Sequence, residues 1–418
     1  MRIRTWYNLN GRKMRPIAPC RGMERVESQK MTVQRMAEWC IMDHAEGPAL
    51  PVGFLTMGRV FLIAALVLVA SVSRVSASDV GDSATSLWMP TFKAYTQIRY
   101  THPETDSDFW SVRRLKFMAD GGQKDGVRYH LQFIYKTHNA SSTDDHPYLQ
   151  DAYLILPSGN IEFKIGQFIP PFGYERFQPD YDLDLVDRTD VTNRMAINGN
   201  IGNSFARDDG IQIDHNRGPW ELSFGLFQGG GANTGSSMNG PLGVARISYG
   251  VPKADAKRGY WRTGFAVADR NAADLDLTKA FSYSGYAWQH FQGEDRRFNG
   301  FVSAGIGPFR GQAEFFQIWL SPDKAGQRAP QGAYVQTSWQ PLANVILAAR
   351  YESFAPDVYD KLSSHHDLWT AGITYDIRFL HLRIACDFSH PTTNWSGSAG
   401  DTVRVQFQWF PPSWRPDL

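Results

Sequence analysis

Charged side chains are concentrated between Pro170 and Gly210, in a stretch with no regular hydrophobic pattern. Eight of them are acidic and four are arginines, so the stretch carries a net charge of −4. The acids are Glu175, Asp180, Asp182, Asp184, Asp187, Asp190, Asp208 and Asp209, and the bases are Arg176, Arg188, Arg194 and Arg207. Such a set can ligate a cation or set the electrostatic field of a water-filled passage.

The cation interpretation rests on three acids at every second position. Asp180, Asp182 and Asp184 have the spacing that opens a calcium-binding loop. The rest of that pattern fails, because Leu185 occupies the glycine position and Val191 the position of the closing glutamate. A non-standard calcium site that ties this stretch down stays open as an alternative. Solvated carboxylates lining a passage are the favoured interpretation, and we predict no metal and no cofactor.

Motifs typical of enzymes are missing from the sequence. It contains no G-x-S-x-G, no H-E-x-x-H, no phosphate-binding loop and no C-x-x-C. His365 and His366 are adjacent, but such a pair in a predicted loop is more often solvated than metal-bound. A Ser/His/acid set assembled from distant strands would leave no motif, so a barrel enzyme stays an alternative. We expect no enzymatic activity.

From residue 91 onward, hydrophobicity alternates with a period of two residues, which indicates β-strands. Between Val127 and Lys136, apolar side chains share one face and polar side chains, Arg128 among them, share the other. A soluble sandwich alternates in the same way. A membrane barrel inverts the arrangement, with apolar side chains toward lipid and polar ones toward a watery lumen.

Segment length and connection length separate the two architectures. Most predicted strands have about ten residues, the length with which a tilted strand crosses a bilayer. They span 91–101, 109–120, 127–137, 148–157, 160–168, 208–216, 219–228, 241–250, 259–268, 297–307, 310–320, 331–340, 343–353, 367–377, 380–389 and 401–410. Short turns alternate with long polar connections, as periplasmic turns alternate with external loops in outer-membrane barrels. The sequence therefore predicts an all-β fold, a 16-stranded antiparallel transmembrane β-barrel with long external loops.

Two further features concern the barrel. The segment 269–296 is assigned to one long external loop, with Phe281 to His290 as an extended finger, because an even strand number keeps both termini on one side. Whether this loop folds outward or into the lumen stays open. Seven tryptophans near strand ends are expected to form girdles at the membrane surfaces, and for each of them an ordinary core tryptophan is the alternative. They are Trp110, Trp220, Trp261, Trp319, Trp339, Trp369 and Trp409.

The N-terminal part is predicted to contain an export signal. Residues 57–77 combine the basic Arg59, an apolar run and the small residues of a cleavage site. The apolar run is shorter than the roughly 20 residues that span a bilayer, and the alternative is a buried core helix. The domain prediction is 1–56 as an extension from a start assigned too far upstream, 57–77 as signal peptide, 78–90 as a short lead, 91–410 as the barrel and 411–418 as a periplasmic tail.

Removing residues 1–77, which hold 11 of the 43 Lys+Arg and 5 of the 42 Asp+Glu, leaves a net charge of −5. This charge argues against a nucleic-acid partner. Only Cys386 remains in that part, so an internal disulfide is excluded there. We predict the outer membrane of a Gram-negative cell as the location, with the lipid bilayer and lipopolysaccharide as partners.

Four stretches resemble, in order, motifs of the phosphate-selective porin O and P family. They are W-S-V-R-R-L-K-F-M-A-D-G (110–121), G-Q-F-I-P-P-F-G-Y-E (166–175), D-G-I-Q-I (209–213) and G-P-F-R-G-Q-A-E-F-F (307–316). The resemblance covers approximately residues 91 to 410. It implies a sixteen-stranded outer-membrane barrel, usually a homotrimer, with a loop after the fifth strand that folds into the lumen. It also implies that Arg113 and Arg114 correspond to an arginine pair of the family.

The segment 170–207 follows the fifth predicted strand. Pro170 and Pro171 end that strand because proline cannot donate to the ladder, and Gly173 permits a sharp turn. A sixteen-stranded barrel leaves a wide aqueous channel, which an inward loop would narrow. We therefore interpret 170–207 as a constriction loop folded inward. A loop lying outside on the barrel mouth is the alternative.

The arginine pair raises a question of orientation, because adjacent strand residues point to opposite faces. Arg114 and Lys116 are expected to face the lumen. Arg113 would then face lipid, at a cost of about 2–4 kcal/mol at the midplane, unless a bulge turns it inward or it lies near the wet rim. These bases either hold an anion or pair with carboxylates of the constriction loop, and both alternatives stay open.

The sequence predicts a porin, a passive aqueous channel for small inorganic ions and solutes. Because the constriction loop is acidic, we expect weak ion selectivity leaning to cations, in contrast to the anion preference that the resemblance implies. The side chains expected to set the field are Arg113, Arg114, Lys116, Arg128, Glu175, Arg176, Asp180, Asp182, Asp184, Asp187 and Arg188. The alternatives are a barrel that sheathes a partner such as an electron-carrying cytochrome, and a surface adhesin.

Overall fold

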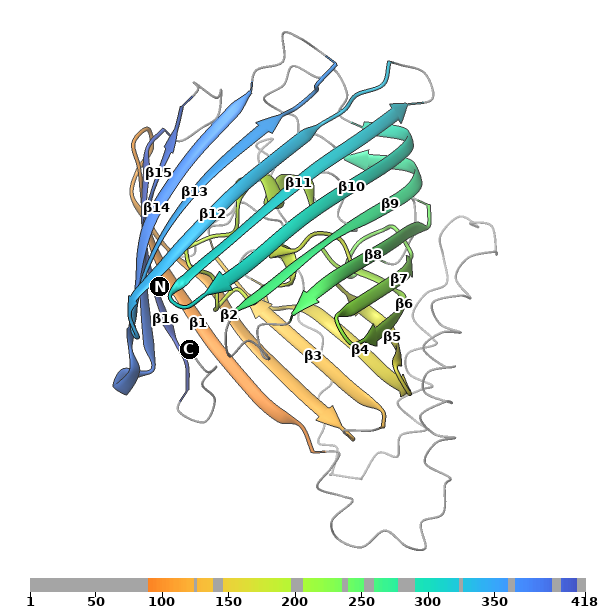
Figure 1. Cartoon of the computed structure of the whole chain (residues 1–418), viewed down its shortest axis with the longest axis horizontal. Coiled ribbons are helices and arrows are strands. Elements are labelled where there is room, and N and C mark those ends of the chain that lie inside the picture. Colours follow the sequence, from red (N-terminus) through yellow and green to blue (C-terminus); the bar gives the residue numbers. More distant parts are fainter. Residues whose placement is uncertain are drawn as a thin grey trace, which may run out of the picture. The chain divides into compact units, whose positions relative to one another are not determined.

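The computed structural model describes residues 89–123, 126–137, 146–196, 206–234, 240–251, 259–276, 290–322, 326–359, 365–392 and 400–411. Within them, sixteen strands form one closed barrel, shown in Figure 1. Each strand pairs antiparallel with the next one in the chain, and β1 pairs with β16 to close the ring. The predicted all-β, sixteen-stranded antiparallel barrel is confirmed.

The strands are close to the predicted segments over most of the chain. They are β1 (Thr91–Pro103), β2 (Phe109–Gly122), β3 (Arg128–Tyr135), β4 (Tyr148–Ser158), β5 (Ile161–Phe168), β6 (Asp208–Arg217), β7 (Trp220–Phe227), β8 (Leu242–Val251), β9 (Tyr260–Asp276), β10 (His290–Ile306), β11 (Phe309–Pro322), β12 (Gln331–Leu342), β13 (Val345–Ala355), β14 (His366–Ile377), β15 (Leu382–Pro391) and β16 (Thr402–Trp409). The described helical elements are η1 (Glu175–Phe177), α4 (Asp190–Met195) and η4 (Arg378–Leu380). No helix among the described residues is both long and apolar enough to cross a membrane.

The strands turn apolar side chains outward and polar side chains inward. On β2, the outward Phe117 is 53% exposed, whereas the inward Lys116 beside it is 5% exposed. On β7, Leu222, Phe224 and Leu226 are exposed and alternate with less exposed residues. A soluble barrel would bury its apolar face, so this arrangement suits a wall between lipid and water. Six of the seven expected girdle tryptophans are exposed, and Trp319 is half-buried.

Connections of different length lie at opposite ends of the barrel. One end, called here the short-turn end, carries the two-residue links at 159–160, 218–219, 307–308 and 343–344. The other, the long-loop end, carries among others the segment between β5 and β6. This sorting matches the predicted alternation. It places the start of β1 and the end of β16 together at the short-turn end.

The predicted external loop 269–296 is wrong in its extent. β9 continues to Asp276 and β10 already begins at His290, and the two strands pair along this extension. Asp269 pairs with Arg296 there, and their side chains are 72% and 60% exposed. Charged side chains lie on both faces of this extension, since Arg270 and Asp295 are buried on the inner face while Asp269 and Arg296 are exposed on the outer one. The alternation of apolar and polar residues is therefore lost, although backbone pairing continues. Most of the predicted finger 281–290 lies outside the described residues.

Other predicted segments also lie outside the described residues. These are 1–56, the signal peptide 57–77, nearly all of the lead 78–90, and the tail 411–418 beyond its first residue. The structure therefore leaves their boundaries as predictions.

The segment after β5 enters the barrel. In Figure 1 it runs inside the ring of strands, and its side chains and backbone contact the inner faces of β1, β2 and β10 to β16. Gly173 has a φ of +88°, the positive value that favours glycine, at the turn that follows the two prolines. The inward fold of this segment, called here the inner loop (170–207), is confirmed for its described part. Residues 197–205 lie outside that part.

An apolar cluster inside the barrel anchors the inner loop. Phe172, Val191 and Met195 of the loop are almost completely buried against apolar side chains of the inner wall. The wall side chains of this cluster come from the long-loop halves of the strands and include Phe227, Leu242, Ala268, Phe316, Ile318 and Phe354. The inner face is thus polar toward the short-turn end and partly apolar where the loop enters. Burial of this kind contributes about 25 cal/mol per Å² of apolar surface.

Candidate functional site

A β-bulge places Arg113 inside the barrel. In the pairing of β1 with β2, Gln97 lies opposite Arg114 and Ile98 lies opposite Val112, so Arg113 is the extra residue. An extra residue interrupts the alternation and re-aims its side chain. The Arg113 Nη2 atom lies 3.3 Å from Oδ1 of Asp187 on the inner loop. Of the two sequence-based alternatives, the bulge is confirmed.

Asp187 is the centre of a basic group. Arg99 donates to it through Nη1 at 2.6 Å and through Nη2 at 3.0 Å, and Arg404 of β16 lies 3.8 Å away. Burial of the Asp187 carboxyl opposes its ionisation, but the neighbouring guanidinium groups of Arg99 and Arg113 outweigh this and hold its pKa well below the usual range. Asp187 therefore stays ionised and holds the loop against β1, β2 and β16.

A second carboxylate of the inner loop contacts the same side of the barrel. Asp180 accepts a hydrogen bond from Lys116 Nζ at 2.6 Å and lies 3.3 Å from Nε of Arg114. Arg188 of the loop also pairs with Asp180. The predicted lumen orientation of Arg114 and Lys116 is thus correct, and both bases contact a loop carboxylate.

Buried carboxylates also hold the loop backbone. Glu314 of β11 accepts the N–H groups of Tyr174 and Glu175, at 2.6 and 2.9 Å. Glu175 in turn accepts from the backbone N–H and hydroxyl of Thr189, which is the N-cap of α4. Glu352 of β13 accepts the N–H of Val191 at 3.1 Å. Backbone donors that would otherwise be unpaired are satisfied by wall carboxylates, which fixes the path of the loop.

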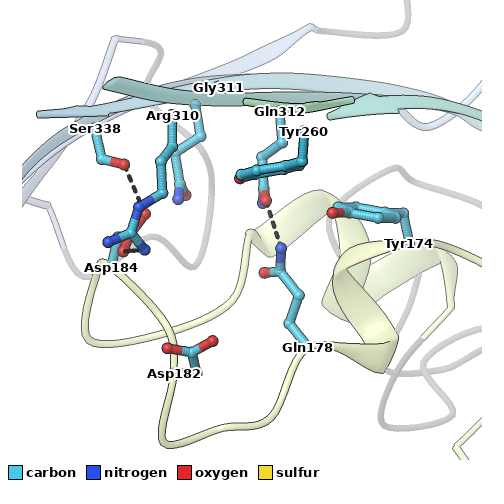
Figure 2. Close-up of a pocket in the computed structure, with 10 residues that line it drawn as sticks. Tyr174, Gln178, Asp182, Asp184, Tyr260, Arg310, Gly311, Gln312 and Ser338 are labelled. Carbon is cyan, nitrogen blue, oxygen red and sulfur yellow. Dashed lines mark hydrogen bonds and ion pairs between the residues drawn. The ribbon is translucent and has the colours of Figure 1, made fainter. Parts of the chain in front are cut away.

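A polar pocket lies between the inner loop and the wall formed by β9, β11 and β12 (Figure 2). Asp184 contacts Arg310 Nη1 at 3.4 Å and accepts from the Ser338 hydroxyl at 2.7 Å. The Gln178 amide donates to Oε1 of Gln312 at 2.5 Å. The pocket is a cavity of about 120 Å³, and its lining comprises Tyr174, Gln178, Asp182, Asp184, Tyr260, Arg310, Gly311, Gln312, Gln336 and Ser338.

The structure brings most of the predicted site residues together at the inner loop. The wall bases Arg113, Arg114 and Lys116, with Arg99, form the basic side of the lumen, which Asp180 and Asp187 of the loop contact. Arg188 pairs with Asp180, Glu175 holds the backbone, and Asp182 and Asp184 line the pocket. Arg176 donates to the backbone oxygen of Ala206 within the loop. Arg128 lies apart, on β3, where it pairs with Glu162 of β5.

The three acids of the calcium-like spacing point to different partners. Asp180 contacts Lys116, whereas Asp184 contacts Ser338, and Asp182 lines the pocket. Among the described residues, no group of three or more His, Cys, Asp or Glu side chains converges as a metal site would require. The described geometry gives the calcium alternative no support.

Several residues of the site carry no sequence signal. Arg99, Arg310 and Arg404 lie 88, 126 and 217 positions along the chain from the loop acids that they contact, and only the closure of the barrel brings them to the loop. Arg310 is part of the G-P-F-R-G motif, which could have drawn attention to it. In the sequence, Gln312 and Gln336 cannot be distinguished from other polar strand residues. Only the folded structure shows that they face the inner loop.

Comparisons with known proteins agree with this architecture. Salmonella typhi OmpF in complex with daunomycin has a TM-score of 0.58 and 10% identity, covering 78% of this chain and 99% of that one. An anion-selective porin from Comamonas acidovorans has a TM-score of 0.51 and 13% identity, covering 77% and 99%. A loop-deletion mutant of OmpT, an outer membrane protein of Vibrio cholerae, has a TM-score of 0.53 and 11% identity, covering 78% and 100%. At such identities, these likenesses show the shared fold alone.

The search of curated proteins finds no match. The family model for phosphate-selective porin O and P matches residues 95–409, which is nearly the whole barrel. The motifs that suggested this family lie on β2, at the end of β5, on β6 and at the start of β11, within the matched range. The chain therefore belongs to the phosphate-selective porin O and P family and is an outer-membrane porin channel.

Proposed function

We propose that this porin is a passive diffusion channel of weak ion selectivity, because its inner loop covers the basic side of its own lumen. The observation that carries the proposal is the pairing of Asp187 with Arg99 and Arg113, together with that of Asp180 with Arg114 and Lys116. An anion filter needs positive charge that faces the permeating ion. Here those bases are buried beneath the loop and already contact carboxylates.

The lumen charges that remain more exposed to water support the same proposal. In the part of the chain that the structure describes, five such bases each pair with an acid, so their opposite charges offset one another. The pairs are Lys93–Asp120, Arg128–Glu162, Lys164–Asp214, Arg262–Glu221 and Arg310–Asp184. The loop's net charge of −4 taken alone overstates its effect, because bases of the wall lie against its acids.

The reversal potential of single channels in a tenfold KCl gradient tests this proposal. An ideally selective channel would give about 59 mV of either sign, as expected for a single-charge Nernst relation. We expect a value near zero, with the slight preference for cations that the sequence predicts. A strongly anion-selective current would contradict the proposal. A protein that inserts into bilayers and conducts no ions would contradict the channel function itself.

The inner loop also bears on the alternative functions. It crosses the lumen from its start at the end of β5 to β13, on the opposite side of the ring, so a partner threaded through the barrel would have to displace it. This favours a channel over a sheath for an electron-carrying cytochrome. The wall contacts of the loop give no support to an adhesin or a barrel enzyme.

We propose further that residues 57–77 direct export, that residues 1–56 are absent from the mature protein, and that the barrel forms a homotrimer in contact with lipopolysaccharide. Support for a trimer comes from the family resemblance and from the trimer form of OmpT of Vibrio cholerae, a similar solved structure with 10% identity, a TM-score of 0.51, and coverage of 77% of this chain and 99% of that one. Mass spectrometry of the purified outer-membrane protein tests the processing. A peptide from before residue 57 would contradict it. Native mass spectrometry in detergent tests the trimer, and a monomer at all concentrations would contradict that state.

A further inference from the structure

The polar pocket of the inner loop has a lining unlike that of an anion site. Three of its side chains are glutamine amides, those of Gln178, Gln312 and Gln336. Each amide offers two donor hydrogens and an acceptor oxygen with two lone pairs. The Gln178 amide donates to Gln312 Oε1 and Gln312 Nε2 donates to the Tyr334 hydroxyl at 3.2 Å, which uses only part of this capacity. The pocket therefore presents uncharged hydrogen-bond donors and uncharged hydrogen-bond acceptors.

The charges of the pocket leave no positive surplus. Arg310 is the base of the lining, and it contacts Asp184 and also donates to Gln340 Oε1 at 2.9 Å. Asp182 adds a second carboxylate, so the lining has one base and two acids. A phosphate dianion would meet net negative charge here. An uncharged solute meets no such penalty.

Two tyrosines complete the pocket. Figure 2 shows Tyr260 beside Gln312, with Tyr174 from the inner loop at the same cavity. The Tyr174 ring stacks on Phe301 at 5.0 Å between ring centroids and an interplanar angle of 20°, which fixes its orientation. A fixed aromatic ring offers an apolar surface with a polar hydroxyl at its edge. The pocket thus combines amides, an arginine paired with a carboxylate, a second carboxylate and aromatic rings. This combination suits a ring-shaped solute that carries many hydroxyl groups.

We propose that this pocket binds an uncharged polyhydroxylated solute, a carbohydrate, on its passage through the channel. The inference rests on the proposed channel function and names the solute class for it. The pocket is only partly enclosed and small, about 120 Å³, so binding is weak and brief, as passage requires. Hydroxyl groups of the solute exchange hydrogen bonds with Gln312, Gln336 and Ser338 of the wall and with Gln178 of the loop.

Interruption of the ion current by sugars tests the proposal. Glucose and sucrose are added to single channels in planar bilayers in KCl, and inorganic phosphate is the comparison probe at the same ionic strength. We expect concentration-dependent block by at least one of the sugars, at concentrations where phosphate leaves the current unchanged. An ion current that neither sugar affects, or that phosphate blocks at lower concentration than either sugar, would overturn the inference while leaving the channel function intact.

Substitutions of pocket residues test whether the sugar binds in this pocket. Gln312→Leu and Gln336→Leu each remove an amide from the pocket, and Gln212→Leu removes a lumen-facing glutamine on β6, away from the pocket, that is buried like Gln336. We expect a roughly tenfold weaker sugar block in each pocket variant, since each loses one or more hydrogen bonds to the solute. The Gln212→Leu channel should be blocked as the unmodified one is. Equal weakening of the sugar block in all three variants would overturn the assignment of the binding site to this pocket. Unchanged sugar block in both pocket variants would also overturn it. The use of two pocket variants keeps the test valid if one of them misfolds.

Discussion

Arg113 contacts Asp187 at 3.3 Å because it is the bulged residue of β2. With regular pairing, its side chain would face lipid, and the adjacent Arg114 alone would face the lumen. The bulge instead turns both arginines toward the inner loop, where they contact different carboxylates, Asp187 and Asp180. Two neighbouring residues of one strand thus fix two points of a loop that begins some sixty positions later.

The contacts of Asp180 and Asp187 predict how ion selectivity responds to their removal. In the double variant Asp180→Asn/Asp187→Asn, the bases Arg99, Arg113 and Lys116 lose their carboxylate partners. We expect the reversal potential in a tenfold KCl gradient to move toward the ideal anion value of about 59 mV, and the conductance to rise as the loop loosens.

The control for this variant removes two acids from the exposed connection between β1 and β2, in Asp106→Asn/Asp108→Asn. Its reversal potential should stay within experimental error of the unmodified channel. If the loop variant also keeps the unmodified reversal potential, the carboxylates do not mask the basic side, and the account of weak selectivity fails.

An ion group on β9 and β10 predicts a large loss of stability. Asp295 is completely buried between Arg270 and Arg297, and Arg297 also donates to the backbone oxygen of Met195 at the end of α4. Asp295→Asn leaves two buried cations without their carboxylate. Breaking such a buried pair costs about 3–5 kcal/mol in the free energy of unfolding, measurable by urea titration of the barrel in detergent micelles.

The neighbouring pair provides a matched control on the same two strands. Asp269 and Arg296 lie one step away in the pairing of β9 with β10 but are exposed. Asp269→Asn should therefore change the free energy of unfolding by less than about 1 kcal/mol, as expected for an exposed ion pair. Equal effects of the two substitutions would show that burial of Asp295 does not determine its contribution.

Two glycines around the start of the inner loop predict different costs for the same substitution. Gly173 has φ +88°, but a Cβ there would meet no atom closer than 3.5 Å, so Gly173→Ala suffers conformational strain alone. Gly166 of β5 has φ +131°, and a Cβ there would lie 2.2 Å from the carbonyl oxygen of Ala152. Gly173→Ala should cost about 1–2 kcal/mol in the free energy of unfolding. Gly166→Ala should cost more, because backbone of the paired strand must move.

The same urea titrations measure both glycine variants. A larger effect at Gly173 than at Gly166 would contradict the distances on which this order rests. Single-channel recordings add an independent measure, because Gly173→Ala strains the turn into the lumen and should change the conductance. Gly166→Ala acts on the wall at the end of β5 and should reduce the yield of folded barrel.

The lowered pKa of Asp187 predicts the pH range in which its contribution to the free energy of unfolding disappears. The unfolded chain protonates aspartate near pH 3.9, whereas the folded protein holds the Asp187 proton only at lower pH. The stabilisation is therefore fully present above about pH 3.9 and is lost as the pH falls further through the folded-state pKa. The difference in unfolding free energy between the unmodified protein and Asp187→Asn should stay constant from pH 7 to about pH 4.5 and shrink below that.

Urea titrations of both proteins across this pH range check the prediction. Comparison of the pair cancels the other titrating groups that the two proteins share. A difference that already shrinks between pH 7 and pH 5 would show that the arginines Arg99 and Arg113 do not lower the pKa of Asp187.

Much of the wall could be predicted from the sequence. Alternation along segments such as Val127 to Lys136, the length of those segments and the sorting of connections together specify a membrane barrel, since each is a local property of the chain. The alternation of apolar and polar residues did not predict strand at 269–276 and 290–296, where β9 and β10 extend beyond the predicted segments. Strand pairing there depends on backbone hydrogen bonds, and side-chain polarity does not distinguish the two faces because both carry charges, Arg270 and Asp295 on the buried face and Asp269 and Arg296 on the exposed one.

The sequence by itself determined the sixteen strands, the outward apolar face and the position at which Pro170, Pro171 and Gly173 end β5. Only the tertiary structure decided that Arg113 turns inward, that Asp187 contacts Arg99, and that Gln178 faces Gln312. The physical reason is distance along the chain. Periodicity and turn residues act over a few neighbouring positions, whereas the lumen is formed by side chains from strands up to three hundred residues apart, which meet only when the ring closes around the loop.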